Sequence, residues 1–350
     1  MQFVIAILAF CIIIIIHELG HFVAAKLCGI QVNEFSLGMG PVLLRKQGKE
    51  TVYSLRAIPI GGFVSMEGEN DESDNPRAFN RKPVWKRMIV ILAGAVMNLI
   101  LGYFVSVGYV CAMDDVATTT VSTFRENSVS SQQLMLDDRI TSIDGLPIFT
   151  STDIIYKLQS GGRATDDGYV AFDIVVDRKG ESVLLEDVKF ELMSSENGIN
   201  SIYFDFTVYP MEKNIGSVLS EGFRESVTTG RLVMLTFWDL ITGRYGLNDL
   251  SGPIGVVDVV SQTVEKGFLE GLVDFLYIVS LITINLGIFN LLPIPALDGG
   301  RFLFLVIEAI RRKPMKPEHE GIVHFIGFAL LMILVVIVTF NDIVRLFSGG

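Results

Sequence analysis

The chain begins with the stretch MQFVIAILAFCIIIIIHELGH, residues 1–21. No side chain among its first sixteen residues is charged, and Gln2 is the clearly polar one. His17, Glu18 and His21 then follow within five positions. An ionisable group at the middle of a bilayer costs at least about 2.5–3.5 kcal/mol. The stretch therefore predicts a membrane-spanning helix whose ionisable residues serve a function.

The spacing of these residues indicates a metal site. On a helix, positions i and i+4 share one face, so His17 and His21 can bind one metal ion with Glu18 beside them. This is the His-Glu-x-x-His pattern of zinc metalloproteases, in which the glutamate acts as general base. The alternative is a pair of interior histidines that hydrogen-bond to neighbouring helices.

The composition predicts a polytopic α-helical membrane protein. The mean hydropathy is +0.49, and 50% of the residues are hydrophobic, which is too high for an ordinary soluble domain. Four apolar blocks are each long enough for the roughly 20 residues that a span requires: residues 4–27, 88–113, 272–292 with a broken continuation to 310, and 322–347. The start of the chain lacks a basic region and a small-residue cleavage site, so we expect the first span to be retained.

These blocks predict seven consecutive segments. They are a first transmembrane helix with the zinc motif (1–28), a membrane-associated β-hairpin region with a basic loop (29–87), a second transmembrane helix (88–113), an extracytoplasmic domain (115–210), an amphipathic helix with a linker (215–268), a third transmembrane segment (270–310) and a fourth (320–347).

The flanking charges predict the orientation. Lys and Arg collect in short cytoplasmic loops, and they cluster at residues 77–87 and 311–316. We therefore expect a multi-pass protein of the inner or plasma membrane with both termini outside and the zinc motif toward the cytoplasmic side. The formal net charge of -11 gives no support for nucleic-acid binding. The three cysteines have no paired spacing, which indicates neither a disulfide framework nor a cysteine zinc site.

Two stretches between the spans predict β-structure. Residues 32–64 contain short extended runs broken by glycine, at 34–37, 42–44, 51–55 and 61–64, which indicates small hairpins. Their free edge would hold an extended peptide by β-augmentation; the alternative is a cytoplasmic hairpin with no substrate role. Residues 115–210 alternate short β-type runs with turns and predict a compact α+β module.

Part of this module resembles a PDZ domain. Ile140 and Ile143, followed by an Asp-Gly turn, are similar to the central PDZ hairpin. Residues 134–138, Leu-Met-Leu-Asp-Asp, depart from the usual carboxylate-binding loop, which ends in Gly-Asp. The departure argues against binding of peptide C-termini.

Residues 217–242 carry apolar side chains at helical spacing. The pattern predicts either an amphipathic helix on the outer membrane face, anchored by Trp238 and Tyr245, or a helix whose apolar side faces a protein core. Both interpretations stand on the sequence.

The third apolar block contains an acid. Residues 290–300 read NLLPIPALDGG, in which two prolines and two glycines interrupt a membrane helix. Asp298 thus lies on irregular backbone at membrane depth, which is tolerated against protein or a cavity. A catalytic zinc has three protein ligands and an open position, so Asp298 is the candidate third ligand. The alternative is an acid that caps the following helix.

HELGH and NLLPIPALDGG together resemble the paired signatures of the site-2 protease family of intramembrane zinc metalloproteases. More narrowly, the chain is similar to the bacterial RseP-type regulators of sigma-factor signalling, in a form with a single PDZ domain. The resemblance extends through FSLGMGP (35–41), IPIGGFV (58–64), NPRAF (75–79), VWKR (84–87) and LSGPIG (250–255). Ala95 departs from the family, which usually has proline there.

The resemblance implies regulated intramembrane proteolysis. His17, His21 and Asp298 would hold Zn²⁺, and Glu18 would act as general base. Substrates would be single-span membrane proteins, such as anti-sigma factors in a stress response or signal-peptide remnants, already cut once outside the membrane. Substrate handling is expected at Gly61, Gly62, Phe63, Val64, Asn290, Pro293 and Pro295.

Two other functions compete. An ion transporter would use the intramembrane charges as an ion path, but the two halves of the chain show no inverted repeat. A catalytically silent protein would hold single-span partners through the PDZ-like module. The presence of all four expected catalytic groups weighs against it.

Overall fold

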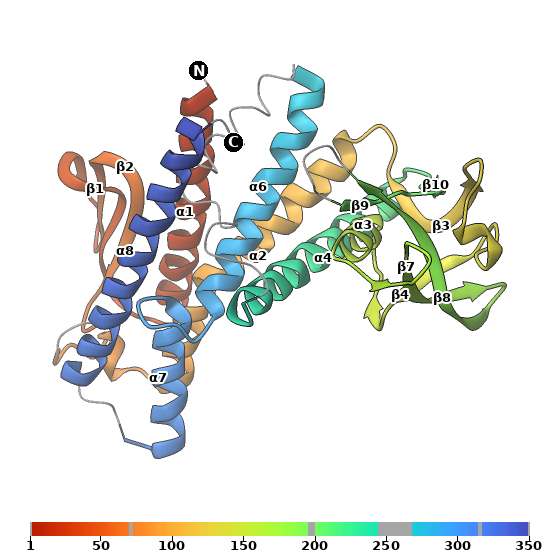
Figure 1. Ribbon diagram of the computed structural model, residues 1–350. Helices are drawn as coiled ribbons and strands as arrows, with labels where there is room; N and C mark the ends of the chain where they lie inside the picture. Colours follow the sequence, from red (N-terminus) through yellow and green to blue (C-terminus); the bar gives the residue numbers. More distant parts are fainter. Residues whose placement is uncertain (1, 70–72, 195–199, 244–267, 314–316, 349–350) are drawn as a thin grey trace. The chain divides into compact units, whose positions relative to one another are not determined.

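The computed structural model describes residues 2–69, 73–194, 200–243, 268–313 and 317–348. The chain divides into two compact units (Figure 1). We call Met1–Val105 with Gly230–Gly350 the membrane unit, and Ser106–Thr229 the α+β unit. All four residues of the expected catalytic centre belong to the membrane unit.

Four helices of the described residues are long and apolar enough to cross a membrane, as predicted. They are α1 (Gln2–Leu27), α2 (Val84–Ala112), α6 (Phe268–Leu291) and α8 (Pro317–Ser348). Their apolar stretches of 21 to 29 residues match the length that a bilayer requires. The chain is therefore a polytopic α-helical membrane protein.

The third apolar block is broken, as its prolines predict. Helix α6 ends at Leu291, and a separate helix α7 (Asp298–Arg311) begins after the prolines. Proline lacks an N–H and cannot continue the hydrogen-bond ladder. Asp298 consequently stands at the first position of a new helix rather than inside a continuous one.

The short β-runs near the N-terminus join in one antiparallel sheet rather than in separate small hairpins. It consists of β1 (Val32–Gln47) and β2 (Val52–Met66). Residues 34–37 pair with 52–55 on one side and with 62–65 on the other, and residues 42–47 fold back onto 52–56. Within the described pairings, residues 62–66 are bonded on one side, so they form an edge of this sheet.

The sheet is fixed to the helix that carries the zinc motif. The rings of Phe22 on α1 and Phe35 on β1 contact edge to face, with centroids 5.2 Å apart. Ala25, Ile30 and Val32 are completely buried in the same cluster. A short 3-10 helix, η1 (Phe79–Arg81), contributes the buried Phe79. The hairpin therefore has a defined position beside α1.

The α+β unit is built on antiparallel strands in the order β10-β3-β4-β7-β8-β9, with β5 paired to β4 and β6 to β7. Phe172 and Phe190 lie in its core with ring centroids 5.9 Å apart. The elements are β3 (Ala117–Phe124), η2 (Ser130–Gln132), β4 (Arg139–Ile143), β5 (Leu146–Pro147), α3 (Ser151–Gln159), β6 (Arg163–Ala164), β7 (Tyr169–Arg178), β8 (Glu181–Ser194), β9 (Asn200–Ile202) and β10 (Phe206–Pro210).

The expected central hairpin of this unit is present. Asp144 and Gly145 both have positive φ, 45° and 78°, as a two-residue turn between β4 and β5 requires. Asp138, in the segment that departs from the PDZ pattern, is completely buried and accepts two hydrogen bonds of 2.7 Å from Arg178. This carboxylate therefore holds the unit together, and the likeness to a PDZ domain stays a prediction.

Helix α4 (Ile215–Ile241) forms where the periodicity predicts it. Phe223 and Trp238 are 60% and 63% exposed, whereas Phe237 packs on Phe289 of α6 with ring centroids 5.5 Å apart. Both interpretations of this helix stay predictions. Glu221 and Glu225 on the same helix are buried. Glu225 accepts a hydrogen bond from the Thr152 hydroxyl, and Glu221 forms an ion pair with Arg224. Tyr245, the other expected membrane anchor, and residues 250–255 lie outside the described residues.

Candidate metal centre

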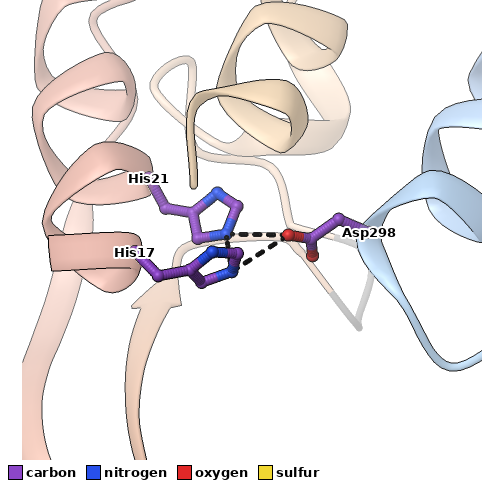
Figure 2. Close-up of side chains that lie close together, drawn as sticks. All are labelled: His17, His21 and Asp298. Carbon is purple, nitrogen blue, oxygen red and sulfur yellow. Dashed lines mark hydrogen bonds and ion pairs between the residues drawn. The ribbon is translucent and has the colours of Figure 1, made fainter. Parts of the chain in front are cut away.

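Two imidazoles project from one face of α1 (Figure 2). His17 and His21 are one helical turn apart, and their Nε2 atoms lie 3.2 Å from each other. The rings meet nearly at right angles, with an interplanar angle of 84°. The i, i+4 spacing of the sequence is thus realised as two nitrogen atoms that face the same point.

Asp298 reaches this point from α7, on the opposite side (Figure 2). Its Oδ2 atom lies 3.1 Å from Nε2 of His17 and 3.2 Å from Nε2 of His21. Zinc bonds of about 2.0–2.1 Å in a tetrahedron place neighbouring ligand atoms about 3.3 Å apart. The triangle of donor atoms fits three corners of such a tetrahedron and leaves the fourth free, so these residues fit a catalytic zinc ion.

The hydrogen bond at the far side of His21 sets the tautomer of its ring. Nδ1 of His21 lies 2.8 Å from the carbonyl oxygen of Val90 on α2. A carbonyl accepts, so Nδ1–H is the donor, and the neutral ring then has its lone pair on Nε2, available to a metal ion. Such a backbone partner is the usual second contact of a metal-binding histidine.

Asn98 of α2 contacts Nδ1 of His17, as the Val90 carbonyl contacts Nδ1 of His21. The asparagine is completely buried, and its Nδ2 lies 3.3 Å from Nδ1 of His17. Its Oδ1 has no hydrogen-bond partner among the described residues. Because the two amide atoms exchange positions by a simple flip, the reversed amide accepts a hydrogen bond from Nδ1–H of His17. Nε2 of His17 then also presents a lone pair to the metal position.

Two glycines bring α1 and α2 into close contact at this site. A Cβ atom at Gly20 would stand 2.4 Å from the carbonyl oxygen of Ala93, and one at Gly94 would stand 2.4 Å from Nε2 of His21 and 2.8 Å from Cε1 of His17. Small residues at helix contacts allow such approach in membranes. Sequence reasoning missed the role of Gly94; the signal available was a small residue in an apolar span, four positions before Asn98. For Asn98, a weaker site candidate, the sequence predicts hydrogen bonding between helices, and its contact with His17 of α1 is of this kind.

Glu18 lies in a cavity of about 380 Å³ that also reaches the three candidate ligands. Phe63, Val64, Ser65 and Met66 of β2 line the same cavity. A Cβ atom at Gly62 would stand 3.3 Å from Cγ of Glu18. The edge of the sheet, the carboxylate and the candidate ligands therefore surround one space.

The remaining sequence-predicted residues lie around rather than in this cavity. Gly61 has φ 87°, a conformation that glycine adopts readily, and it precedes the cavity-lining residues of β2. Asn290 is buried in the last turn of α6. Pro293 and Pro295 belong to the turn that leads to Asp298, and none of these four lines the cavity. The structure brings together His17, Glu18, His21, Asp298, Phe63 and Val64, with Gly62 against Glu18.

An ion pair that the sequence did not indicate borders the cavity. Nη1 of Arg301, on the first turn of α7, donates to Oε1 of Glu69, which follows β2. The glutamate side chain is 13% exposed and the arginine side chain 36%. This pair joins the segment after the hairpin to the helix that starts at Asp298.

Comparison with known proteins gives a match over almost the whole chain. The model of peptidase family M50 matches residues 5–334. The chain is 38% identical to a protein of Clostridium acetobutylicum whose provisional name is zinc metalloprotease, over 97% of each chain. It is 30% identical to the regulator of sigma-W protease RasP of Bacillus subtilis, over 99% of this chain and 100% of that protein. It is also 30% identical to the zinc metalloprotease RasP of Bacillus licheniformis, over 97% and 98%.

Proposed function

Because the chain belongs to peptidase family M50, the site-2 protease family, we propose that His17, His21 and Asp298 are its zinc ligands and Glu18 its catalytic base. The predicted activity, zinc-dependent intramembrane proteolysis in a regulated cascade, is confirmed by this membership. It also favours proteolysis over an ion transporter or a silent binding protein. The observation that carries the site assignment is the triangle of donor atoms, with sides of 3.1–3.2 Å, in the cavity of Glu18.

Glu18 performs the proton transfers in this proposal. When bound, zinc supplies Lewis-acid chemistry that acidifies a water molecule and polarises the scissile carbonyl. The Glu18 carboxylate takes a proton from the attacking water and then donates it to the leaving amine. Asn98 and the Val90 carbonyl orient the two imidazoles throughout. Asp298, from a different helix, completes the set.

The edge of β2 is the proposed substrate-binding strand. A substrate helix hides its carbonyls in hydrogen bonds to residues four positions away, so cleavage requires local unwinding. An unwound segment can add to the edge formed by residues 62–66 through main-chain hydrogen bonds. Phe63 and Val64, which line the cavity with Glu18, would then set which side chains fit. Asn290, Pro293 and Pro295 remain candidates for substrate handling.

The substrate class is proposed to be single-span membrane proteins already trimmed outside the membrane, including anti-sigma factors and signal-peptide remnants. The sigma-W regulator name of the Bacillus subtilis relative supports the first of these. The α+β unit, with its PDZ-like hairpin, would lie outside and exclude proteins that still carry a large outer domain. Both termini would also lie outside, with the zinc site toward the cytoplasmic side.

One comparison tests the centre. Wild-type protein, Glu18→Gln and Asp298→Asn are purified in detergent, their zinc content is measured, and each is incubated with a single-span substrate. We expect wild type and Glu18→Gln to hold one zinc, Asp298→Asn to lose it, and cleavage to require both residues. Equal cleavage by wild type and Glu18→Gln would contradict the base assignment, and a zinc-free wild type would contradict the metal site.

A deletion tests the exclusion of untrimmed substrates. Ala117 on β3 pairs with Pro210 on β10, so removing residues 118–209 leaves two adjacent ends that a short linker can join. Wild type should cleave a trimmed substrate at least ten times faster than an intact one, whereas the deletion variant should cleave both at similar rates. An unchanged preference after deletion would rule out this role of the α+β unit.

A further inference from the structure

The turn that carries Asp298 depends on a neighbouring helix for one of its hydrogen bonds. In residues 292–297, Pro293 and Pro295 have no N–H, and three of the four remaining amides donate to carbonyls of the turn itself or of α6. The N–H of Ala296 instead donates to Nδ1 of His324 on α8, at 2.8 Å. An amide without a partner is costly in a membrane protein, so His324 satisfies a need that the turn leaves open.

The backbone of Ala296 is in an unfavourable conformation that this contact helps to maintain. Its φ is 76°, in the left-handed region, which disfavours residues with a Cβ atom. A non-glycine residue keeps such a conformation when its surroundings hold it there. Ala296 lies two residues before Asp298, so a relaxation of its backbone would move the carboxylate directly.

His324 is itself held in place by α7. Its ring packs edge to face on Phe304, with centroids 5.5 Å apart. Because Nδ1 accepts from Ala296, the neutral ring carries its proton on Nε2, which lies 3.8 Å from Oε1 of Glu320. The ring also lines a cavity of about 350 Å³ together with Asp298 and Arg301. The acceptor nitrogen is therefore aimed at the turn by fixed packing.

One turn further along α8, Gly327 makes a second contact with the same segment. A Cβ atom at Gly327 would stand 2.4 Å from Cβ of Pro295 and 2.7 Å from its carbonyl oxygen. On the other side, a Cβ atom at Gly299 would stand 2.1 Å from the carbonyl oxygen of Leu292. The turn is thus in close contact with the start of α7 on one side and with the backbone of α8 on the other.

We propose that His324 and Gly327 are positioning residues, through which α8 fixes the Asp298 carboxylate at the distance that the zinc site requires. His324 acts by hydrogen bonding the strained Ala296, and Gly327 acts by admitting Pro295 against α8. This inference rests on the proposed role of Asp298 as a zinc ligand. It assigns to the fourth transmembrane helix a function in metal binding, although the three proposed ligands lie on other helices.

The test measures metal affinity in the full-length protein, by competition with a chromophoric chelator and by the absorption bands of the Co²⁺-substituted site. His324→Phe keeps the ring packing and removes the acceptor, and we expect zinc affinity to fall at least tenfold and the Co²⁺ bands to change. His324→Asn places an amide oxygen near the position of Nδ1, so affinity should stay within about threefold of wild type. Gly321→Ala, at a position of α8 with open space around it, is the matched control.

Two further variants make each outcome decisive. Gly327→Ala should lower zinc affinity as His324→Phe does, and this variant decides the outcome if His324→Phe does not fold. In an Ala296→Gly background, which removes the strain, His324→Phe should lose less affinity. Wild-type affinity and Co²⁺ bands in both His324→Phe and Gly327→Ala would overturn the inference. If Asp298→Asn also keeps its zinc, the proposed ligand set fails instead.

Discussion

The backbone of Gly94 on α2 forms the surface against which the imidazole of His21 lies, and it leaves no space for a side chain. A Cβ atom there would approach Nε2 of His21 to 2.4 Å and Cε1 of His17 to 2.8 Å. The candidate metal site is therefore shaped by a residue that is not one of the proposed ligands. Close packing of this kind tolerates little change in volume.

Gly94→Ala should weaken zinc binding by at least tenfold, because the added methyl group displaces both imidazoles from the metal position. Chelator competition on the purified protein measures the loss. Gly321→Ala adds the same methyl group to α8 where nothing lies within 4 Å, and it should bind zinc like wild type. A Gly94→Ala protein with full zinc affinity would show that α2 does not confine the ligands.

Asn98 should affect the metal through His17. With its amide oxygen toward Nδ1 of His17, Asn98→Leu should lower zinc affinity about 10- to 100-fold, the usual effect of losing the outer partner of a metal-binding histidine. Asn98→Asp should retain most of the affinity, because a carboxylate also accepts from Nδ1–H. The variants are compared by zinc titration.

The aspartate variant separates the two amide orientations. If Nδ2 of Asn98 were the donor, a carboxylate would face the lone pair of His17, and Asn98→Asp would lose zinc as strongly as Asn98→Leu. Thr283→Val removes a buried hydroxyl whose hydrogen bond, to the carbonyl of Val279, stays within α6. It should leave zinc affinity unchanged.

The spans and the metal-binding pattern could be predicted from the sequence because two strong constraints act on them. A bilayer requires about 20 apolar residues, and an ionisable residue inside such a stretch needs a function. His17 and His21 satisfied a spacing rule, and Asp298 was recognisable as an acid on a proline-broken span. None of these inferences required knowledge of tertiary contacts.

The strand pairing near the zinc motif could not be predicted in the same way. Four short apolar runs in residues 32–66 allow many antiparallel arrangements, and the observed one pairs residues 34–37 with two different partners. Contacts with α1, such as Phe22 on Phe35, select it. The role of Gly94 was hidden for a similar reason, because small residues in a span have many uses. For Asn98 the sequence predicted a hydrogen bond between helices but not its partner, His17.

The ion pair between Arg301 and Glu69 should stabilise the membrane unit, since the glutamate is largely buried. Arg301→Leu and Glu69→Leu should each lower stability by roughly 1–3 kcal/mol, and the double variant should lose less than the sum, because neither charge is then left alone. Unfolding in mixed micelles measures the coupling. The exposed pair Arg81–Asp74, whose acid is fully accessible, is the control, and its coupling energy should be below about 1 kcal/mol. If the losses of the two single variants simply add in the Arg301–Glu69 double variant as well, the expectation is wrong.

The α+β unit should lose stability as the pH rises, because of Glu225 on α4. Burial, together with the nearby carboxylates of Glu221 and Asp153, raises the pKa of Glu225 from 4.5 to about 7, although a hydrogen bond from Thr152 acts in the opposite direction. The folded unit thus binds a proton more tightly than the unfolded chain does. The stabilisation is fully present below pH 4.5 and is lost as the pH rises through about 7.

Hydrogen exchange in α3 (Ser151–Gln159) checks this in the full-length protein, because the Thr152 hydroxyl donates to Glu225. The unfolding free energy falls by about 1.4 kcal/mol per pH unit between the two pKa values, so the total loss is on the order of 3 kcal/mol. Protection factors, corrected for intrinsic exchange, should therefore fall by roughly a hundredfold between pH 4.5 and pH 7.5. Glu225→Gln should abolish this dependence, since a neutral amide occupies the site at every pH. Glu212→Gln, at an exposed glutamate just before α4, should keep it. A pH dependence that persists in Glu225→Gln would assign it to another group.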